Sequence, residues 1–266
     1  MSPGSLPRRR RDPQAPPPKG VLSGEREPLF AYLPEEVQRN MQRRESESAL
    51  VWEAFYPFAH AGISLKDWSS IRPLWGSPVP SAIDDRLIPY FWGLRVDGSP
   101  LAGLAEAAQA VAGREDRLEV DLYLKGSRVL VAIEAKTDGD PARCGRYEAG
   151  RCPEIHGGDK PCRYWDGPST FDPSLDFGIR PGPGLEERPP CARHYQLART
   201  LLMVENLGRA NGLEPYLCLL IPRRRWPSLF SPWEDFAERV RDEAQWRRLR
   251  VVGWEDLEGL KGQWGM

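Results

Sequence analysis

The chain has 266 residues, with 37 lysines and arginines against 38 aspartates and glutamates, so its formal net charge is −1. This length accommodates one large domain or two small ones. A nearly neutral chain has no general attraction for nucleic acid, so such binding would require a local basic surface. No apolar run reaches the roughly 18 residues that a membrane span needs. No apolar secretory segment follows the start, so we expect a cytoplasmic protein.

Residues 1–27 are rich in proline, arginine, glycine and serine, and they include a basic run from Arg8 to Arg11. Such a segment cannot bury enough apolar surface to order itself, so the sequence predicts a disordered basic tail. A weak contact of this tail with phosphate groups is the alternative. Residues 28–266 are then expected to form one domain.

A long helical region is expected over residues 34–60. Pro34, which two glutamates follow, is typical of a helix start. The apolar positions of the second half recur at helical spacing: Leu50, Val51, Ala54 and Phe55. Glu47 lies on or near the face that these positions define.

The next stretch, residues 64–100, is rich in tryptophan and proline and indicates several turns. Within it, Asp84-Asp85 is interpreted as part of a loop or a helix cap rather than as a metal-binding pair. Residues 101–112 have a strong intrinsic propensity for helix and lead into the central part of the chain.

Residues 118–136 have the pattern of a β-hairpin, with Gly126-Ser127 as the turn between two strands. In the first strand, positions 118, 120, 122 and 124 are apolar and share one face, while positions 119, 121 and 123 share the other. The second strand is apolar on both faces from Val129 to Ile133, which is typical of a strand that is covered on both sides.

Three charged residues of this hairpin form one group. A two-residue turn pairs Asp121 with Ala132, which makes Asp121 and Glu134 diagonal neighbours on one face, roughly 7–8 Å apart at the backbone. Lys136 follows two residues later on the same face. Carboxylates at the end of a covered strand are costly unless a cation compensates them, and oxygen-only ligands suit Mg²⁺ or Mn²⁺. The sequence therefore predicts a metal site at Asp121 and Glu134, with Lys136 orienting water or neutralising charge. An edge strand with solvated charges is the alternative.

Regular patterns stop between residues 137 and 191, in a stretch that is full of glycine and proline. This stretch contains four of the five cysteines: Cys144, Cys152, Cys162 and Cys191. A loop of this length in a compact domain is usually functional or held by another constraint. Four thiols are the right number for a structural Zn²⁺, and His156 or His194 could replace one of them. Free thiols, an iron–sulfur cluster and disulfides are the other interpretations, and disulfides are rare in the cytoplasm.

The last third of the chain again alternates between helix and strand patterns. Residues 192–211 form an amphipathic helix with Gly212 as its C-cap. Residues 216–221 form a strand in which Cys218 is buried. A helix is expected to open at Ser231 and Pro232, and a short strand at residues 249–252 and a closing helix from Trp254 are expected to follow.

A basic cluster follows the expected strand at residues 216–221. It consists of Arg223, Arg224 and Arg225, with Trp226 next to them. Arginines and an aromatic ring side by side could contact the backbone of a nucleic acid, and a solvated loop is the alternative.

The order of Asp121 and then Glu134-Ala135-Lys136 across a hairpin resembles the PD-(D/E)xK nuclease superfamily. The resemblance covers roughly residues 45–260. Within that range, the run Cys-Arg-Tyr-Trp-Asp at residues 162–166, which Tyr195-Gln196-Leu197 follows, is similar to a bacterial group of restriction-type nucleases with a cysteine-rich insertion. Val120 stands where the superfamily usually has a proline.

The resemblance implies an α/β fold like that of restriction endonucleases, with a central mixed sheet between helices and a cysteine-containing loop insertion at residues 137–191. Residues 28–266 would then be a nuclease-like domain. The resemblance also implies that Glu47, on the first core helix, reaches the metal site, and that Gln196 points toward the water at the metal or the scissile phosphate. Arg199 follows three residues later and could bind phosphate. Surface polar residues are the alternative for all three.

The function that these features predict is Mg²⁺-dependent hydrolysis of phosphodiester bonds, with DNA as the expected partner, in restriction, defence or repair. The alternatives are a nucleic-acid-binding module without catalysis and an interaction module that Zn²⁺ stabilises. A homodimer is one option for its assembly, and no membrane partner is expected.

Overall fold

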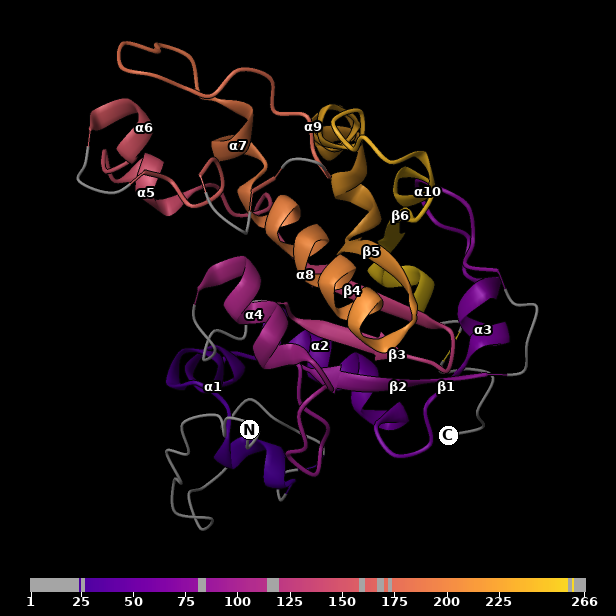
Figure 1. Cartoon of the computed structure of the whole chain (residues 1–266). Coiled ribbons are helices and arrows are strands. Elements are labelled where there is room, and N and C mark those ends of the chain that lie inside the picture. Colours follow the sequence, from indigo (N-terminus) through magenta and orange to yellow (C-terminus); the bar gives the residue numbers. More distant parts are fainter. Residues whose placement is uncertain are drawn as a thin grey trace.

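The computed structural model describes residues 24, 27–80, 85–113, 120–157, 161–166, 170–171, 174–257 and 260. The tail expected at residues 1–27, with its basic run Arg8–Arg11, therefore lies almost wholly outside the described residues. In the described part, helices and strands alternate along the chain, and a long irregular insertion lies between β4 and α8 (Figure 1).

A mixed β-sheet forms the centre of the molecule. In the described part of the chain it has six strands, in the order β1-β2-β3-β4-β5-β6. The strands are β1 (Ile63–Ser64), β2 (Arg86–Phe91), β3 (Leu122–Lys125), β4 (Val129–Ala135), β5 (Glu214–Ile221) and β6 (Leu249–Gly253). The strands from β1 to β4 pair antiparallel, whereas β4, β5 and β6 pair parallel. The predicted α/β class with a mixed sheet is confirmed.

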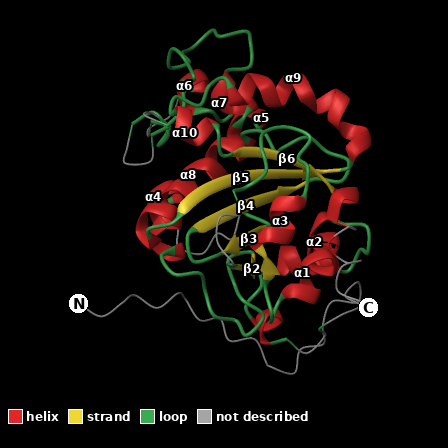
Figure 2. Cartoon of the chain, turned by 90° about the vertical axis from the view of Figure 1, so that its right-hand side faces the viewer, coloured by secondary structure: helices red, strands yellow, loops and turns green. Residues whose placement is uncertain are grey.

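Helices cover both faces of this sheet (Figure 2). The α-helices are α1 (Glu35–Met41), α2 (Glu47–Phe55), α3 (Leu65–Ser70), α4 (Leu104–Ala112), α5 (Gly145–Glu148), α6 (Pro153–His156), α7 (Pro190–Arg193), α8 (Tyr195–Asn211), α9 (Trp226–Ala237) and α10 (Glu243–Trp246). Short 3₁₀ helices are η1 (Pro28–Ala31), η2 (Tyr56–Phe58), η3 (Arg223–Arg225) and η4 (Trp254–Leu257). One core lies between the sheet and α1–α3, and a second lies between the sheet and α4, α8 and α9.

The strand β4 is buried along its whole length, so its alternation divides it between the two cores. Val129, Val131 and Ile133 belong to the core under α2, and Leu130 and Ala132 belong to the core under α8. This confirms the prediction of a strand covered on both faces. By the same alternation, Glu134 follows Ala132 and faces α8.

The register of the hairpin differs from the predicted one. Leu122 pairs with Ile133, so that the next position on each strand sets Asp121 beside Glu134 rather than Ala132. The register differs because the turn is centred on Ser127 and Arg128 instead of on Gly126 and Ser127. The Gly126 N–H closes this turn by donating a hydrogen bond to the Val129 carbonyl at 2.9 Å. A shift of two residues leaves the paired side chains from Leu122 to Lys125 on their expected faces, because the period of a strand is two.

The alternation of the first strand ends where β3 begins. Val120 packs in the same core as Tyr123, whereas Leu122 belongs to the opposite core. The chain bends at Asp121, whose carbonyl accepts a hydrogen bond from the Trp92 N–H at 3.0 Å. The prediction that Val120 shares a face with Leu122 was therefore wrong, and the predicted positions 118 and 119 lie outside the described residues.

Two expected helices have different limits. The region at residues 34–60 divides into α1 and α2, because Ser46 caps α2 by accepting a hydrogen bond from the Ala49 N–H at 3.2 Å. The helix expected from Ser231 begins earlier, at Trp226, with Pro227 in its first turn and Pro232 inside it. A proline fits the first turn of a helix because it lacks only an N–H that has no partner there.

Candidate active site

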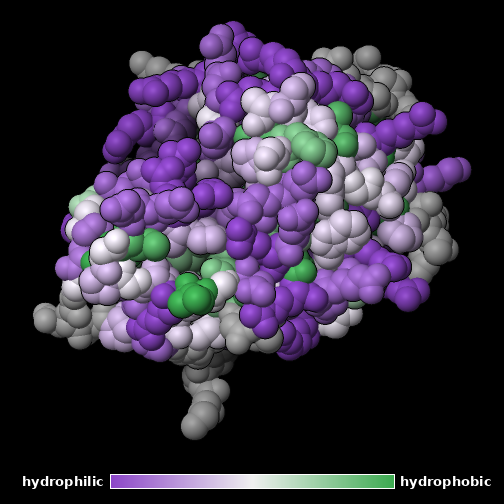
Figure 3. Space-filling view, turned by 90° about the horizontal axis from the view of Figure 1, so that it is seen from above, coloured by the Kyte–Doolittle hydropathy of each residue, from purple (hydrophilic) through white to green (hydrophobic). Residues whose placement is uncertain are grey.

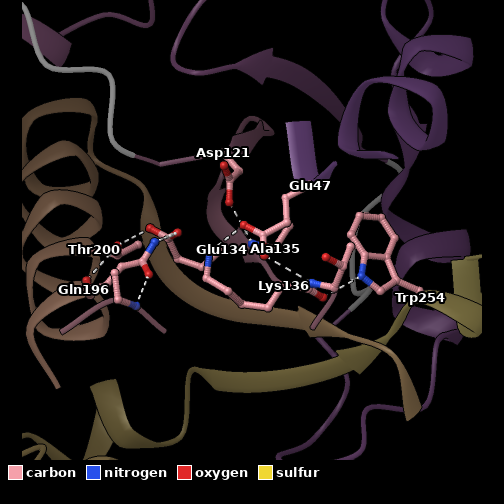
Figure 4. Close-up of polar contacts among 10 residues, drawn as sticks. Glu47, Asp121, Glu134, Ala135, Lys136, Gln196, Thr200 and Trp254 are labelled. Atoms are coloured by element: carbon pink, nitrogen blue, oxygen red, sulfur yellow. Dashed lines mark hydrogen bonds and ion pairs between the residues drawn. The ribbon is translucent and has the colours of Figure 1, made fainter. Parts of the chain in front are cut away.

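Four charged side chains meet at the carboxyl end of β4 (Figure 4). Asp121 comes from the bend before β3, Glu134 from β4, Lys136 from the residue after β4 ends, and Glu47 from the first turn of α2. Glu134 is fully buried and Lys136 is only 8% exposed. The fold thus brings the four residues together, although α2 and β4 are far apart in the sequence.

Asp121, from the bend before β3, acts on the ionisation of Glu134 on β4. Asp121 Oδ2 accepts a hydrogen bond from the Ala135 N–H at 2.9 Å, next to Glu134 in the chain. Burial raises the pKa of Glu134 to about 8, and the neighbouring Asp121 carboxylate raises it as well. Burial also raises the pKa of Asp121 to about 6, against the attraction of Lys136. Glu134 is therefore hard to ionise at neutral pH without an added positive charge.

Helix α8 fixes the carboxylate of Glu134. The Gln196 side-chain amide donates to Glu134 Oε2 at 2.6 Å, and the Thr200 hydroxyl donates to Oε1. Gln196 and Thr200 are four residues apart and so lie on the same face of the helix. The resemblance predicted that Gln196 points toward the water at the metal or the scissile phosphate, and the structure shows its side-chain amide bonded to Glu134.

Glu47 of α2 binds both the side chain of Lys136 and the backbone next to it. Lys136 Nζ forms an ion pair with Glu47 Oε2 at 2.9 Å, while the Thr137 N–H donates to Glu47 Oε1 at 3.2 Å. Burial acts to lower the pKa of Lys136, but three carboxylates outweigh burial and raise the pKa above its ordinary value. Lys136 is therefore a permanent cation within a group of acids.

The charges of this site do not balance. The three carboxylates that act on Lys136 are those of Asp121, Glu134 and Glu47, so full ionisation leaves an excess of two negative charges. One divalent cation would remove that excess, and carboxylate oxygens are the ligands that Mg²⁺ prefers. In the described parts of the chain, no group of three histidine, cysteine, aspartate or glutamate side chains is arranged to hold a metal ion. A Mg²⁺ here would therefore rely on Asp121, Glu134 and water, as Mg²⁺ sites commonly do.

A cavity of about 440 Å³ opens onto the site from the side of α1 and α2. Asp121, Glu47 and Thr137 line it together with Trp92, Ser46 and Asn40. Glu134 and Lys136 lie behind this lining, so a substrate that enters the cavity meets Asp121 and Glu47 first.

The arginines that were predicted to contact nucleic acid are not part of this group of charged residues. Ion pairs join Arg223 to Asp256, Arg224 to Asp138 and Arg225 to Asp140. Two of these pairs fasten the chain just after β4 to the start of α9, although the pair of Arg224 is exposed and hence weak. Arg199 is buried, and its guanidinium lies over the Tyr195 ring at 5.2 Å. It lines a second cavity, together with the four cysteines of the insertion.

Sequence reasoning missed three contributors to the site. Thr200 could have been found from its spacing of four residues after Gln196. The other two are the Thr137 N–H and the Trp254 indole, which donates to the Lys136 carbonyl at 3.0 Å. No local pattern marks them, because backbone groups and contacts over 118 residues are set by the fold.

The raised pKa values predict how the metal-free protein responds to pH. The pKa of Glu134 rises from the ordinary 4.5 to about 8, so between these values the folded chain binds more protons than the unfolded chain. Stability therefore falls as the pH rises through this window. We expect the Tm in a chelator to decrease from pH 5 to pH 8, and Mg²⁺ to restore it at pH 8 but not at pH 5. A Tm that Mg²⁺ leaves unchanged at pH 8 would contradict the interpretation that a divalent cation compensates the excess negative charge of this site.

None of the described helices combines the length and the apolar character that crossing a bilayer demands. Comparison of the chain with family models, with curated proteins and with solved structures found no match.

Proposed function

We propose that the protein is a Mg²⁺-dependent nuclease of the PD-(D/E)xK superfamily, which hydrolyses phosphodiester bonds in DNA. The observation that supports this most is the group of three carboxyl groups around a buried lysine at the carboxyl end of β4, which carries an excess of two negative charges when fully ionised. A purely structural network would gain stability by replacing these acids with apolar residues. Their presence in the core therefore favours a catalytic role.

The arrangement of elements supports the same family. An antiparallel hairpin (β3 and β4) carries Asp121, Glu134 and Lys136, and α8 follows and leads to the parallel strand β5. Gln196 lies on α8, and Glu47 lies on a helix of the opposite layer. This order of elements along the chain agrees with the resemblance, which implies a fold like that of restriction endonucleases.

Each residue has a role in this proposal. Asp121 and Glu134 hold the ion, and Gln196 and Thr200 keep the Glu134 oxygens in place. A bound Mg²⁺ supplies a Lewis acid that stabilises negative charge on a phosphodiester oxygen. Lys136, which Glu47 holds at 2.9 Å, orients the attacking water or neutralises charge that develops on the phosphate.

The test is cleavage of plasmid DNA, linear DNA and RNA by the purified protein, with Mg²⁺, Mn²⁺ or a chelator. We expect DNA cleavage that requires the metal, and an Asp121→Asn variant should lose it at least about 100-fold, because the amide removes one of the two charged ligands. Asp97→Asn is the matched control, since Asp97 forms a turn with Ser99 away from the site.

Other outcomes decide between the alternatives. Binding of DNA without cleavage under every condition would identify a module that has the fold but no activity. Cleavage of RNA alone would change the substrate class and leave the metal chemistry in place. Full activity in the chelator, or in the Asp121→Asn variant, would refute the assignment of the site.

A further inference from the structure

The insertion between β4 and α8 contains a long segment that lacks a hydrophobic anchor. None of the described residues in 137–157 and 161–163 is buried. The helices α5 and α6 lie within this segment, and neither has a buried residue. Seen from above, the side of the molecule that includes the top of the insertion is mostly hydrophilic (Figure 3). Burial of apolar surface therefore does not offset the conformational entropy that ordering this segment costs.

Four cysteines from separate turns of the insertion converge on one cavity. Cys144 directly precedes α5, Cys152 directly precedes α6, Cys162 opens a turn, and Cys191 lies in α7. All four line the same cavity, which has a volume of about 520 Å³. Cys144 and Cys152 lie on either side of α5, which has no buried residue. They therefore lie in the part of the segment that needs an anchor.

Burial and the neighbouring thiols shift the pKa values of two of these cysteines. Burial, together with the three other cysteines, raises the pKa of Cys191 to about 12. Burial also raises the pKa of Cys162, and Cys144 and Cys152 contribute in the same direction. The four cysteines are free thiols rather than disulfides. Zn²⁺ binds thiols as thiolates, and its charge offsets the cost of ionising them.

Arginines surround the cysteines on several sides. The cavity is lined by Arg146, Arg151, Arg163 and Arg199 as well as by the four sulfur-bearing residues. Four thiolates around one Zn²⁺ carry two net negative charges, so nearby guanidinium groups stabilise such a centre.

The two histidines of this region do not complete a different ligand set. His194 is buried, and its Nε2 lies 2.6 Å from Asp235 Oδ2. His156 is exposed and does not line the cavity. Glu154 also lines the cavity, but its carboxylate already accepts hydrogen bonds from the Cys162 N–H and from Arg180, so the four cysteines are the candidate ligands.

We propose that Cys144, Cys152, Cys162 and Cys191 bind one Zn²⁺, which fastens the earlier turns of the insertion to α7, just before α8. No three described side chains of the acidic, cysteine or histidine types stand at ligand spacing, so binding draws the exposed turns at Cys144 and Cys152 inward. The Cys144 N–H already donates to the Ala192 carbonyl at 2.9 Å, which joins the first ligand turn to the segment of the last ligand. The ion replaces the missing hydrophobic anchor.

Elemental analysis of the purified full-length chain tests this proposal. We expect about one Zn²⁺ per chain, in line with a four-thiolate site. The variants Cys152→Ala and Cys162→Ala should lose at least fivefold of the bound zinc. Cys218→Ala is the matched control, because Cys218 is buried in β5, outside the cavity, and this variant should keep its zinc.

A second measurement on the unaltered chain covers the case in which a cysteine variant does not fold. Trypsin should cleave the wild-type protein at Arg143, Arg146 or Arg151 at least tenfold faster after a zinc chelator is added. Glu134→Gln should retain the zinc, so the metal content is independent of the proposed nuclease activity. Zinc-free protein in which the four cysteines of the insertion react freely, bound iron in place of zinc, or full zinc in both Cys152→Ala and Cys162→Ala would each overturn the proposal.

Discussion

Glu134→Gln is expected to abolish DNA cleavage, by at least about 1,000-fold, and at the same time to stabilise the metal-free protein. Burial and Asp121 raise the pKa of Glu134 to about 8, so its ionised form destabilises the folded chain. A neutral amide of the same shape removes that cost and can still accept a hydrogen bond from Thr200. We expect a gain of about 1–3 kcal/mol in the free energy of unfolding at pH 8. Denaturant titration in a chelator measures this gain.

Glu205→Gln is the matched control for this experiment. Glu205 also lies on α8, and burial raises its pKa as well, but it bonds to Ser174 at 2.7 Å instead of to the site. This variant should retain full cleavage and should not change the response to Mg²⁺. If Glu134→Gln instead lowered stability while cleavage persisted, Glu134 would be a structural residue and the proposed site would be wrong.

Lys136→Met is expected to abolish cleavage by a similar factor but to lower stability, which is the opposite effect on folding. Lys136 is the cation that faces Asp121, Glu134 and Glu47, so its removal leaves three carboxylates without compensation. Breaking a buried pair costs about 3–5 kcal/mol, and we expect about 2–4 kcal/mol here. The lower range reflects Glu47, whose side chain is 31% exposed and keeps part of its hydration.

Mg²⁺ should recover part of the stability of Lys136→Met without restoring its activity, because a divalent ion replaces the charge but not the ammonium group beside the phosphate. Lys125→Met is the control, since Lys125 lies at the turn end of the same hairpin. A Lys136→Met variant that cleaves normally would show that the lysine only balances charge. Opposite stability changes in two inactive variants would be the signature of a site whose carboxylates are arranged to bind a divalent cation.

The charged residues of the site could be predicted because they depend on local rules. A two-residue period predicts that Glu134 and Lys136 lie close together at the end of one strand, and the hairpin brings Asp121 beside Glu134 even though its register differs by two residues. The surroundings of Arg199 and the ion-pair partners of Arg223–Arg225 could not be predicted, because both depend on tertiary packing. The fold buries Arg199 beside the cysteines, where no pattern in the helix sequence would place it.

The sequence by itself determined the alternation of helices and strands, the buried character of β4, and the identities of the acids and thiols, since period and residue type are local properties. Only the tertiary structure decided that Thr200 and Gln196 fix Glu134, that Glu47 pairs with Lys136, and that four cysteines from separate turns face one cavity. Those contacts join segments that are far apart in the chain. Their geometry follows from how the layers pack on the sheet, which no local sequence window contains.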